Sequence, residues 1–223
     1  MSYKACIFDL DGTLANTVES IAFVANTVLK KFGYGPLPTE KFYYYCGEGG
    51  RKLMERCLLD CGDTQLTYLD EGERLYIDLF AQNPLYRVVP YEGMTETLNS
   101  LKKRGVYLAV CTNKPHQAAV ETVEGVFGKG LFHGIQGQCE TVRRKPAPDA
   151  PLRMAELFGV KPQECVYVGD TWTDMKTGKA AGMYTVGVLW GFRDRAELEE
   201  NDADLIISRP EELLGLFKGE END

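Results

Sequence analysis

The sequence predicts an α/β protein, with a doubly wound parallel sheet as its core and a small all-helical domain inserted after the first strand. A short apolar run, 5–8, leads directly to Asp9 and Asp11, as a buried parallel strand does when its carboxyl end opens into a loop. Helical spacing of apolar residues then dominates 16–86, and strands alternate with helices from Val89 onward. Repeated βα units of this kind form parallel sheets with helices on both faces.

The segment after the first strand is expected to contain only helices. Apolar residues recur at helical spacing over 18–29, and the stretch 33–38, bounded by Gly and Pro, ends this helix. A glycine loop, 47–50, interrupts the remaining helical stretches, which are 42–46, 51–59 and 66–80.

The rest of the chain alternates between the two kinds of element. Strands are expected at 106–111, 134–137, 165–168, 184–189 and 205–207. Helices are expected at 91–104, 115–125, 148–158, 174–181 and after the last strand. We therefore expect a core domain of residues 1–15 and 87–223 and a helical domain of residues 16–86.

The composition is that of a globular protein, with 44% hydrophobic and 26% charged residues. A formal net charge of −8 argues against nucleic acid as a partner, because phosphate backbones are bound through an excess of Lys and Arg. No stretch approaches the ~20 apolar residues of a membrane span, and the first strand begins too early for a signal peptide. We expect a cytoplasmic monomer or weak homodimer that contacts neither nucleic acid nor membrane.

Polar side chains follow three of the expected strands. They are Asp9 and Asp11, then Thr112 and Asn113, then Asp170, with Asp174 one helical turn further on. Ligand crevices in open α/β sheets lie at this end of the strands. Two carboxylates as close as those of Asp9 and Asp11 repel each other unless a cation or a shared proton lies between them. This arrangement favours Mg²⁺, which prefers oxygen ligands.

Each of these residues also has a simpler structural interpretation. Asp-Leu-Asp-Gly is a common turn sequence, and Thr112 and Asp170 suit helix N-termini. Lys145 lies in a basic stretch that is typical of a solvated surface, but the following proline restricts its backbone. Four carboxylates at one edge also need positive charge beyond one Mg²⁺ if a phosphate is to enter, and a lysine supplies it.

Together these segments resemble the four motifs of the haloacid dehalogenase superfamily, in that family's order. The segments are Asp9-Leu10-Asp11-Gly12-Thr13, the strand ending in Thr112-Asn113, Lys145-Pro146, and the stretch from Gly169 to Asp174. Thr112-Asn113-Lys114-Pro115 and Val188-Leu189-Trp190-Gly191 further resemble the phosphoglycolate phosphatase group. The resemblance implies a Rossmann-like core with the helical domain as a cap. Asn16-Thr17 replaces the family's common Asp-Ser pair, which affects substrate fit more than chemistry.

The resemblance implies a Mg²⁺-dependent phosphatase that hydrolyses a small phosphomonoester, with 2-phosphoglycolate as the preferred candidate. Asp9 would be the nucleophile that forms an aspartyl-phosphate, and Asp11 the general acid and then the general base. The metal residues implied are Asp9, Asp11 (through its backbone carbonyl), Asp170 and Asp174. Thr112 and Lys145 would bind phosphoryl oxygens. The substrate-binding residues expected are Thr112, Asn113, Lys145, Gly49, Gly50 and Arg51.

Other functions stay open at this point. A phosphohexomutase of the β-phosphoglucomutase type uses the same core carboxylates and differs mainly in how the cap holds a sugar phosphate. A non-catalytic phosphate-binding regulator could share the scaffold. Haloacid dehalogenation fits poorly, because that reaction needs no acid two residues after the nucleophile, and Asp11 occupies that position.

The glycine loop before Arg51 suggests how the cap reads its substrate. Glycines let a backbone approach a ligand closely, and the helix that follows offers free N–H groups to an anion. We expect Arg51 to bind a carboxylate beyond the phosphate, as a planar guanidinium does well. The alternative is a flexible loop with a solvated Arg51.

Overall fold

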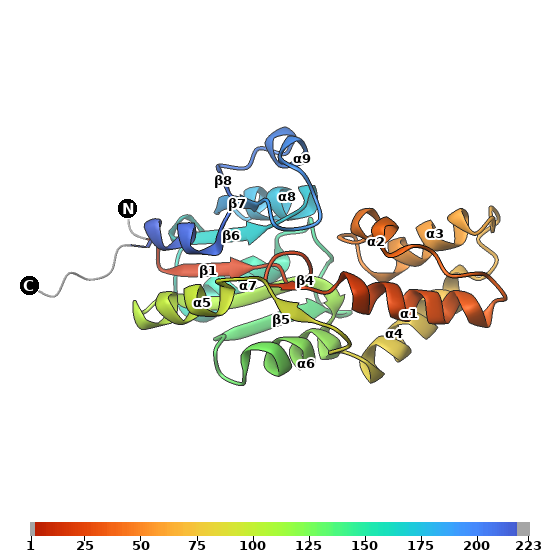
Figure 1. Cartoon of the computed structure of the whole chain (residues 1–223). Helices are drawn as coiled ribbons and strands as arrows, with labels where there is room; N and C mark the ends of the chain where they lie inside the picture. Colours follow the sequence, from red (N-terminus) through yellow and green to blue (C-terminus); the bar gives the residue numbers. More distant parts are fainter. Residues whose placement is uncertain (1–2, 218–223) are drawn as a thin grey trace, which may run out of the picture.

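A six-stranded parallel sheet forms the centre of the molecule in the computed structural model, which describes residues 3–217 (Figure 1). The strands are β1 (Ala5–Phe8), β4 (Tyr107–Pro115), β5 (Gly134–Gln138), β6 (Cys165–Gly169), β7 (Tyr184–Val188) and β8 (Leu205–Ile207). Their order in the sheet is β5-β4-β1-β6-β7-β8, and Ala5 of β1 pairs with Tyr107 on one side and Cys165 on the other. The predicted α/β fold class is confirmed.

Helices cover both faces of this sheet (Figure 1). They are α5 (Met94–Lys103), α6 (His116–Phe127), α7 (Asp149–Phe158), α8 (Trp172–Ala180) and the shorter α9 (Arg195–Glu200), with 3₁₀ turns at Pro162–Glu164 and Pro210–Gly215. Alternation along β1 sends Phe8 to the cluster that contains Leu98 of α5, and Ile7 to the opposite cluster, which contains Met154 of α7. The central strand is therefore buried on both faces, as parallel strands are.

Four further helices lie beside the sheet, at one end of its strands (Figure 1). They are α1 (Val18–Lys31), α2 (Thr39–Tyr45), α3 (Gly50–Asp60) and α4 (Leu69–Gln82), called here the helical insertion. These helices pack around an apolar cluster that includes the buried Phe42, Leu58 and Phe80. A two-residue antiparallel pair, β2 (Ala15–Asn16) with β3 (Val89–Pro90), brings the two connections to the core side by side.

Local contacts explain why α4 begins at Leu69 rather than at the predicted Leu66. The Asp63 carboxylate accepts hydrogen bonds from the backbone N–H groups of Thr67 (3.0 Å) and Tyr68 (3.2 Å). Within the turn that these contacts close, Leu66 has a φ of 54°, outside the helical region. The side chain of Asp63 therefore competes with the first helical turn.

Two elements near the C-terminal end also differ from the prediction. Helix α9 lies where none was expected, and the Asp194 side chain caps it by accepting from the Glu197 N–H at 3.1 Å. The helix expected after β8 is instead the 3₁₀ turn Pro210–Gly215. None of the helices among residues 3–217 is long and apolar enough to cross a membrane.

Neighbouring leucines of α3 test whether the helical insertion has a core of its own. Leu58 is fully buried, whereas Leu59 is 43% exposed. We expect Leu58→Ala to lower the free energy of unfolding by about 2–5 kcal/mol, and Leu59→Ala to change it by less than about 1 kcal/mol. Urea unfolding followed by circular dichroism measures both. Equal losses in the two variants would contradict this packing.

Candidate active site

The first strand places Asp9 at the carboxyl edge of the sheet, where its side chain is 6% exposed. The Leu10 N–H donates to Asp9 Oδ1 at 2.7 Å and fixes the carboxylate. The loop then turns at Gly12, which has a φ of 87°. A Cβ at Gly12 would lie 2.3 Å from Oδ2 of Asp170. Glycine is therefore required here both by the backbone angle and by the close approach of a second carboxylate.

Asp170 follows β6, and residues from two other loops hold it in place. The Thr13 hydroxyl donates to its Oδ1 at 2.9 Å, and the Phe192 N–H donates to its Oδ2 at 2.8 Å. Asp174 lies in the first turn of α8, where the Thr171 hydroxyl donates to its Oδ2 at 2.8 Å. Both carboxylates are fully buried. The loop after β1 and the start of α8 are thereby joined at one edge of the sheet.

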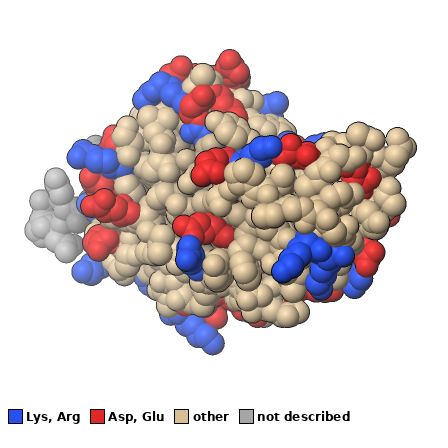
Figure 2. Space-filling view, turned by 45° about the vertical axis from the view of Figure 1, so that its right-hand side comes forward, with Lys and Arg blue, Asp and Glu red and all other residues tan. Residues whose placement is uncertain are grey.

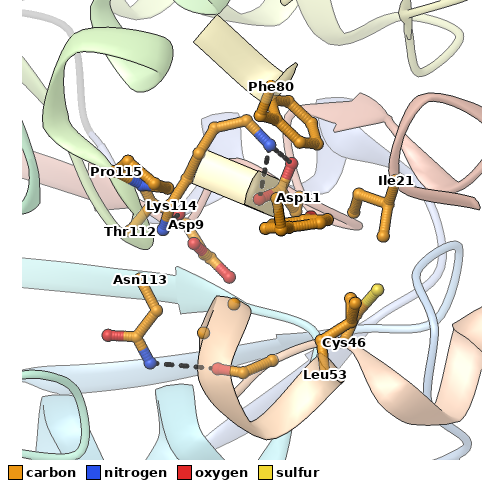
Figure 3. A pocket seen from close by; sticks show the side chains of 14 residues that line it. Asp9, Asp11, Ile21, Cys46, Leu53, Phe80, Thr112, Asn113, Lys114 and Pro115 are labelled. Atoms are coloured by element: carbon orange, nitrogen blue, oxygen red, sulfur yellow. Dashed lines mark hydrogen bonds and ion pairs between the residues drawn. The ribbon is translucent and has the colours of Figure 1, made fainter. Parts of the chain in front are cut away.

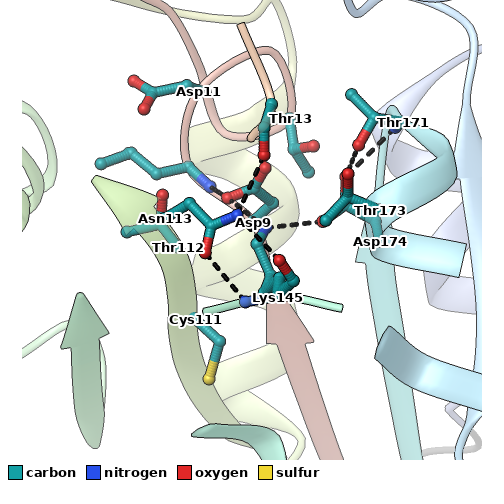
Figure 4. A network of polar contacts seen from close by, with 12 residues as sticks. Asp9, Asp11, Thr13, Cys111, Thr112, Asn113, Lys145, Thr171, Thr173 and Asp174 are labelled. Atoms are coloured by element: carbon teal, nitrogen blue, oxygen red, sulfur yellow. Dashed lines mark hydrogen bonds and ion pairs between the residues drawn. The ribbon is translucent and has the colours of Figure 1, made fainter. Parts of the chain in front are cut away.

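The Lys145 ammonium lies between two of these carboxylates (Figure 4). Its Nζ is 2.9 Å from Oδ1 of Asp9 and 2.7 Å from Oδ1 of Asp174, and the side chain is 3% exposed. The Asn113 carboxamide holds the loop, because its Oδ1 accepts from the Lys145 N–H at 2.9 Å. Lys145 is therefore a buried part of the carboxylate cluster.

The buried cluster carries more negative than positive charge. Oxygens of Asp9, Asp170 and Asp174 lie within 4.8 Å of one another, and Lys145 is the cation that bonds to two of them. Three carboxylates and one ammonium leave a net charge of −2 when all are ionised. On the face of the molecule shown in Figure 2, by contrast, positive and negative side chains are interspersed.

Burial and the neighbouring charges shift the pKa values of the cluster. Burial raises the pKa of Asp9 to about 7, although the Lys145 ammonium opposes the shift. Burial, Asp174 and Asp9 raise the pKa of Asp170 well above its ordinary value. Burial alone would lower the pKa of Lys145, but Asp174 and Asp9 outweigh it and raise that pKa. Additional positive charge would stabilise the cluster, and its oxygen donors are those that a hard divalent cation prefers.

A second, partly buried ion pair involves Lys114, to which the sequence analysis gave no role. Its Nζ donates to both Asp11 oxygens, at 2.8 and 3.1 Å, and lies 4.1 Å from the centre of the Phe80 ring. Strand β4 continues to Pro115 instead of ending at the predicted Cys111. Its position two residues after Thr112, in the Thr112-Asn113-Lys114-Pro115 segment, is the signal that could have identified it.

A cavity of about 40 Å³ separates the sheet edge from the helical insertion (Figure 3). The core contributes Asp9, Asp11, Thr112, Asn113, Lys114 and Pro115 to its lining. The insertion contributes Ile21, Cys46, Gly47, Gly49, Gly50, Leu53, Tyr76 and Phe80. The two elements also touch directly, because the Asn113 Nδ2 donates to the Gly47 carbonyl at 3.0 Å. One wall of the cavity is therefore polar and charged, and the other is mainly apolar.

Residues 6–188 match the family of haloacid dehalogenase-like hydrolases. The chain belongs to this family. A phosphoglycolate phosphatase from Aquifex aeolicus is 31% identical over 214 residues, which cover 96% of each chain. Another from Neisseria meningitidis is 34% identical over 215 residues, 95% of this chain and 89% of its relative.

A solved structure agrees with this membership. A candidate phosphoglycolate phosphatase from Lactobacillus delbrueckii subsp. bulgaricus superimposes with a TM-score of 0.92 at 28% identity. The superposition covers 99% of this chain and 100% of that one. The resemblance stated from the motifs and the expectation of a hydrolase are therefore confirmed.

Within this haloacid dehalogenase-like fold, the predicted site residues fall into two groups. Those that line the cavity are Asp9, Asp11, Thr112, Asn113, Gly49 and Gly50, and those of the buried cluster beside it are Lys145, Asp170 and Asp174. Arg51 belongs to neither group. Its guanidinium pairs with Asp70 and Glu73 of α4, each at 2.8 Å, and the side chain is 44% exposed. These two carboxylates of α4 neutralise the charge of the Arg51 guanidinium, which lies outside the cavity lining.

Substitution of Lys145, compared with substitution of the surface residue Lys52, tests the buried cluster. Lys145→Met leaves Asp9 and Asp174 buried without their cation, so the free energy of unfolding in metal-free buffer is expected to fall by about 3–5 kcal/mol. The control Lys52→Met removes an exposed pair with Glu55, which is worth less than about 1 kcal/mol. Denaturant titration measures both variants. A Lys145 variant as stable as the control would be inconsistent with a buried ion-pair cluster.

Proposed function

We propose that this protein is a Mg²⁺-dependent phosphatase that hydrolyses a small phosphomonoester, with 2-phosphoglycolate as the best candidate. The observation that carries the proposal is the position of Asp9 in the cavity wall, with Lys145 2.9 Å from one oxygen and the Lys114-bound Asp11 nearby. Relatives named phosphoglycolate phosphatase, at 31% and 34% identity over nearly the whole chain, support the choice of substrate.

The proposal divides the chain into a core of residues 1–15 and 87–223 and a cap of residues 16–86. The separate apolar cluster of α1–α4 and the paired connections β2 and β3 support this division. The cavity lies between the two parts, so movement of the cap would admit substrate and then exclude water.

Asp9 is assigned the role of nucleophile. Its Oδ1 accepts from Leu10 and pairs with Lys145, whereas no hydrogen bond from residues 3–217 reaches its Oδ2. Oδ2 attacks phosphorus, and a bond from Asp9 to phosphorus forms as the bond from phosphorus to the ester oxygen breaks. The product is an aspartyl-phosphate, which divides one difficult displacement into two easier ones.

Asp11 is assigned the proton transfers. It gives its proton to the leaving ester oxygen, and the alcohol departs. The same carboxylate then takes a proton from water, whose oxygen attacks phosphorus and releases phosphate and the Asp9 carboxylate. Thr112, which lines the cavity, and Lys145 donate to the phosphoryl oxygens as negative charge develops on them, with Asn113 fixing the Lys145 backbone.

Mg²⁺ would be held by a carboxylate oxygen of Asp9, the backbone carbonyl of Asp11 and the carboxylate of Asp170. When bound, it would neutralise negative charge on the phosphoryl group. The fit rests on the excess of negative charge among the clustered carboxylates. Asp174 is assigned a supporting role, because its Oδ1 is bonded to Lys145 and its Oδ2 to Thr171. It therefore orients the residues that contact substrate and metal.

The central test of this function is phosphate release from p-nitrophenyl phosphate. The wild type is expected to be active with MgCl₂ and inactive with excess chelator. Asp9→Asn is expected to lower kcat by about 10³-fold or more, because the nucleophilic oxygen is lost, while the melting temperature shows that the fold persists. Asp78→Asn, on the surface of α4, serves as the matched control.

Full activity in the Asp9 variant would refute the covalent mechanism. Conversion of a hexose phosphate to its isomer, without phosphate release, would instead indicate a mutase.

A further inference from the structure

Lys114 is the only positively charged residue among the fourteen that line the cavity, all of which lie in the described part of the chain. Its side chain is 3% exposed, and the close view shows it extending from β4 toward Asp11 and Phe80 (Figure 3). The opposite wall, from the helical insertion, is mainly apolar or glycine. The cavity thus offers one cation for a group on the substrate other than the phosphate.

The surroundings of the ammonium favour an anionic ligand. Its Nζ donates to both Asp11 oxygens, at 2.8 and 3.1 Å, and an ammonium has three N–H donors. The Phe80 ring, 4.1 Å away, covers one side of it. Attraction between charges strengthens where water is excluded. A substrate carboxylate that contacts this ammonium beside Asp11 would therefore bind far more strongly than a neutral group.

The other cations near the cavity are bound to acidic residues other than Asp11. Lys145 lies between Asp9 and Asp174, on the phosphoryl side. Arg144 pairs with Glu73 at 3.2 Å, which also pairs with Arg51. Lys114 is therefore the cation on the side of Asp11, where the leaving group lies in the proposed mechanism.

We propose that Lys114 determines leaving-group specificity by binding a carboxylate attached one carbon from the ester oxygen. The inference rests on the proposed function, because Asp11 must lie within hydrogen-bond distance of the ester oxygen that it protonates. The Lys114 Nζ lies 2.8 Å from Asp11, so a carboxylate one carbon from that oxygen reaches the ammonium. One Asp11 oxygen turns to the ester oxygen, and the substrate carboxylate takes its place on Lys114.

A matched pair of substrates isolates this contact. 2-Phosphoglycolate and its neutral amide have nearly the same shape and the same phosphate, and differ in the charge that Lys114 would bind. The wild type is expected to prefer the acid by about 10- to 100-fold in kcat/KM, the range of a charge-assisted hydrogen bond. In Lys114→Met this preference falls to about one, mainly through KM for the acid.

The ratio of kcat/KM for the two substrates distinguishes loss of the substrate-carboxylate contact from loss of the contact between Lys114 and Asp11. Loss of the contact with Asp11 slows both reactions together and leaves the ratio unchanged. Lys129→Met removes an 85%-exposed lysine and is expected to keep the wild-type ratio. A wild-type ratio near one, or an unchanged ratio in the Lys114 variant, would overturn the proposal. If Lys114→Met does not fold, Lys114→Gln keeps a polar side chain without the charge and is measured in the same way.

Failure of the proposed function has a different signature. If the wild type hydrolyses neither ester, it is not the phosphatase proposed. Calorimetric binding of the acid and the amide to wild type and Lys114→Met then decides the role of Lys114. A preference for the acid that is lost in the variant supports the inference, and equal binding of the two compounds to the wild type overturns it.

Discussion

The contact of the Lys145 ammonium with Asp9 and Asp174 is the interaction on which the site depends. It joins the end of β1, the loop before α7 and the first turn of α8, three segments far apart in the sequence. Without a cation, two fully or nearly fully buried carboxylates would face each other in a medium that screens charge poorly. The parallel sheet makes the contact possible, because it places the carboxyl ends of its central strands at one edge.

The same electrostatic balance connects structure to function. Lys145 neutralises part of the cluster formed by Asp9, Asp170 and Asp174, and the remaining negative charge suits a divalent cation. A cation bound at this edge would attract a dianionic phosphate group. Without that cation, the negative charge of the carboxylates would repel the phosphate. Burial first, and the neighbouring carboxylates second, raise the pKa values of Asp9 and Asp170.

Sequence reasoning predicted the carboxylate cluster well, because parallel strands must end at a common edge and Asp9 and Asp170 directly follow strands. It did not foresee contacts that depend on packing between elements. The sequence predicts that Arg51 binds substrate, and the structure places Glu73 of α4 2.8 Å from its guanidinium, so a role for Arg51 in substrate binding stays a prediction. Lys114 received no role, because the extension of β4 beyond Cys111 and its approach to Phe80 depend on tertiary contacts.

Contacts made by Arg193 show how closely the helical insertion and the core are joined in this structure. Arg193, next to the Phe192 N–H that binds Asp170, donates to the Tyr43 carbonyl and, at 3.0 Å, to the Cys46 carbonyl near the end of α2. A residue that supports the carboxylate cluster is thus adjacent in the chain to one that holds the insertion. In the proposed enzyme, this linkage would couple closure of the cap to the arrangement of the metal-binding carboxylates.

In the proposed mechanism, Asp9 carries the phosphoryl group covalently during turnover. Borohydride reduces an aspartyl-phosphate to homoserine, so the enzyme is quenched with borohydride while it hydrolyses p-nitrophenyl phosphate and is then analysed by peptide mass spectrometry. We expect homoserine at position 9, with Asp11 and Asp170 unchanged. An unmodified Asp9 in an actively turning-over sample, or homoserine at another aspartate, would contradict it.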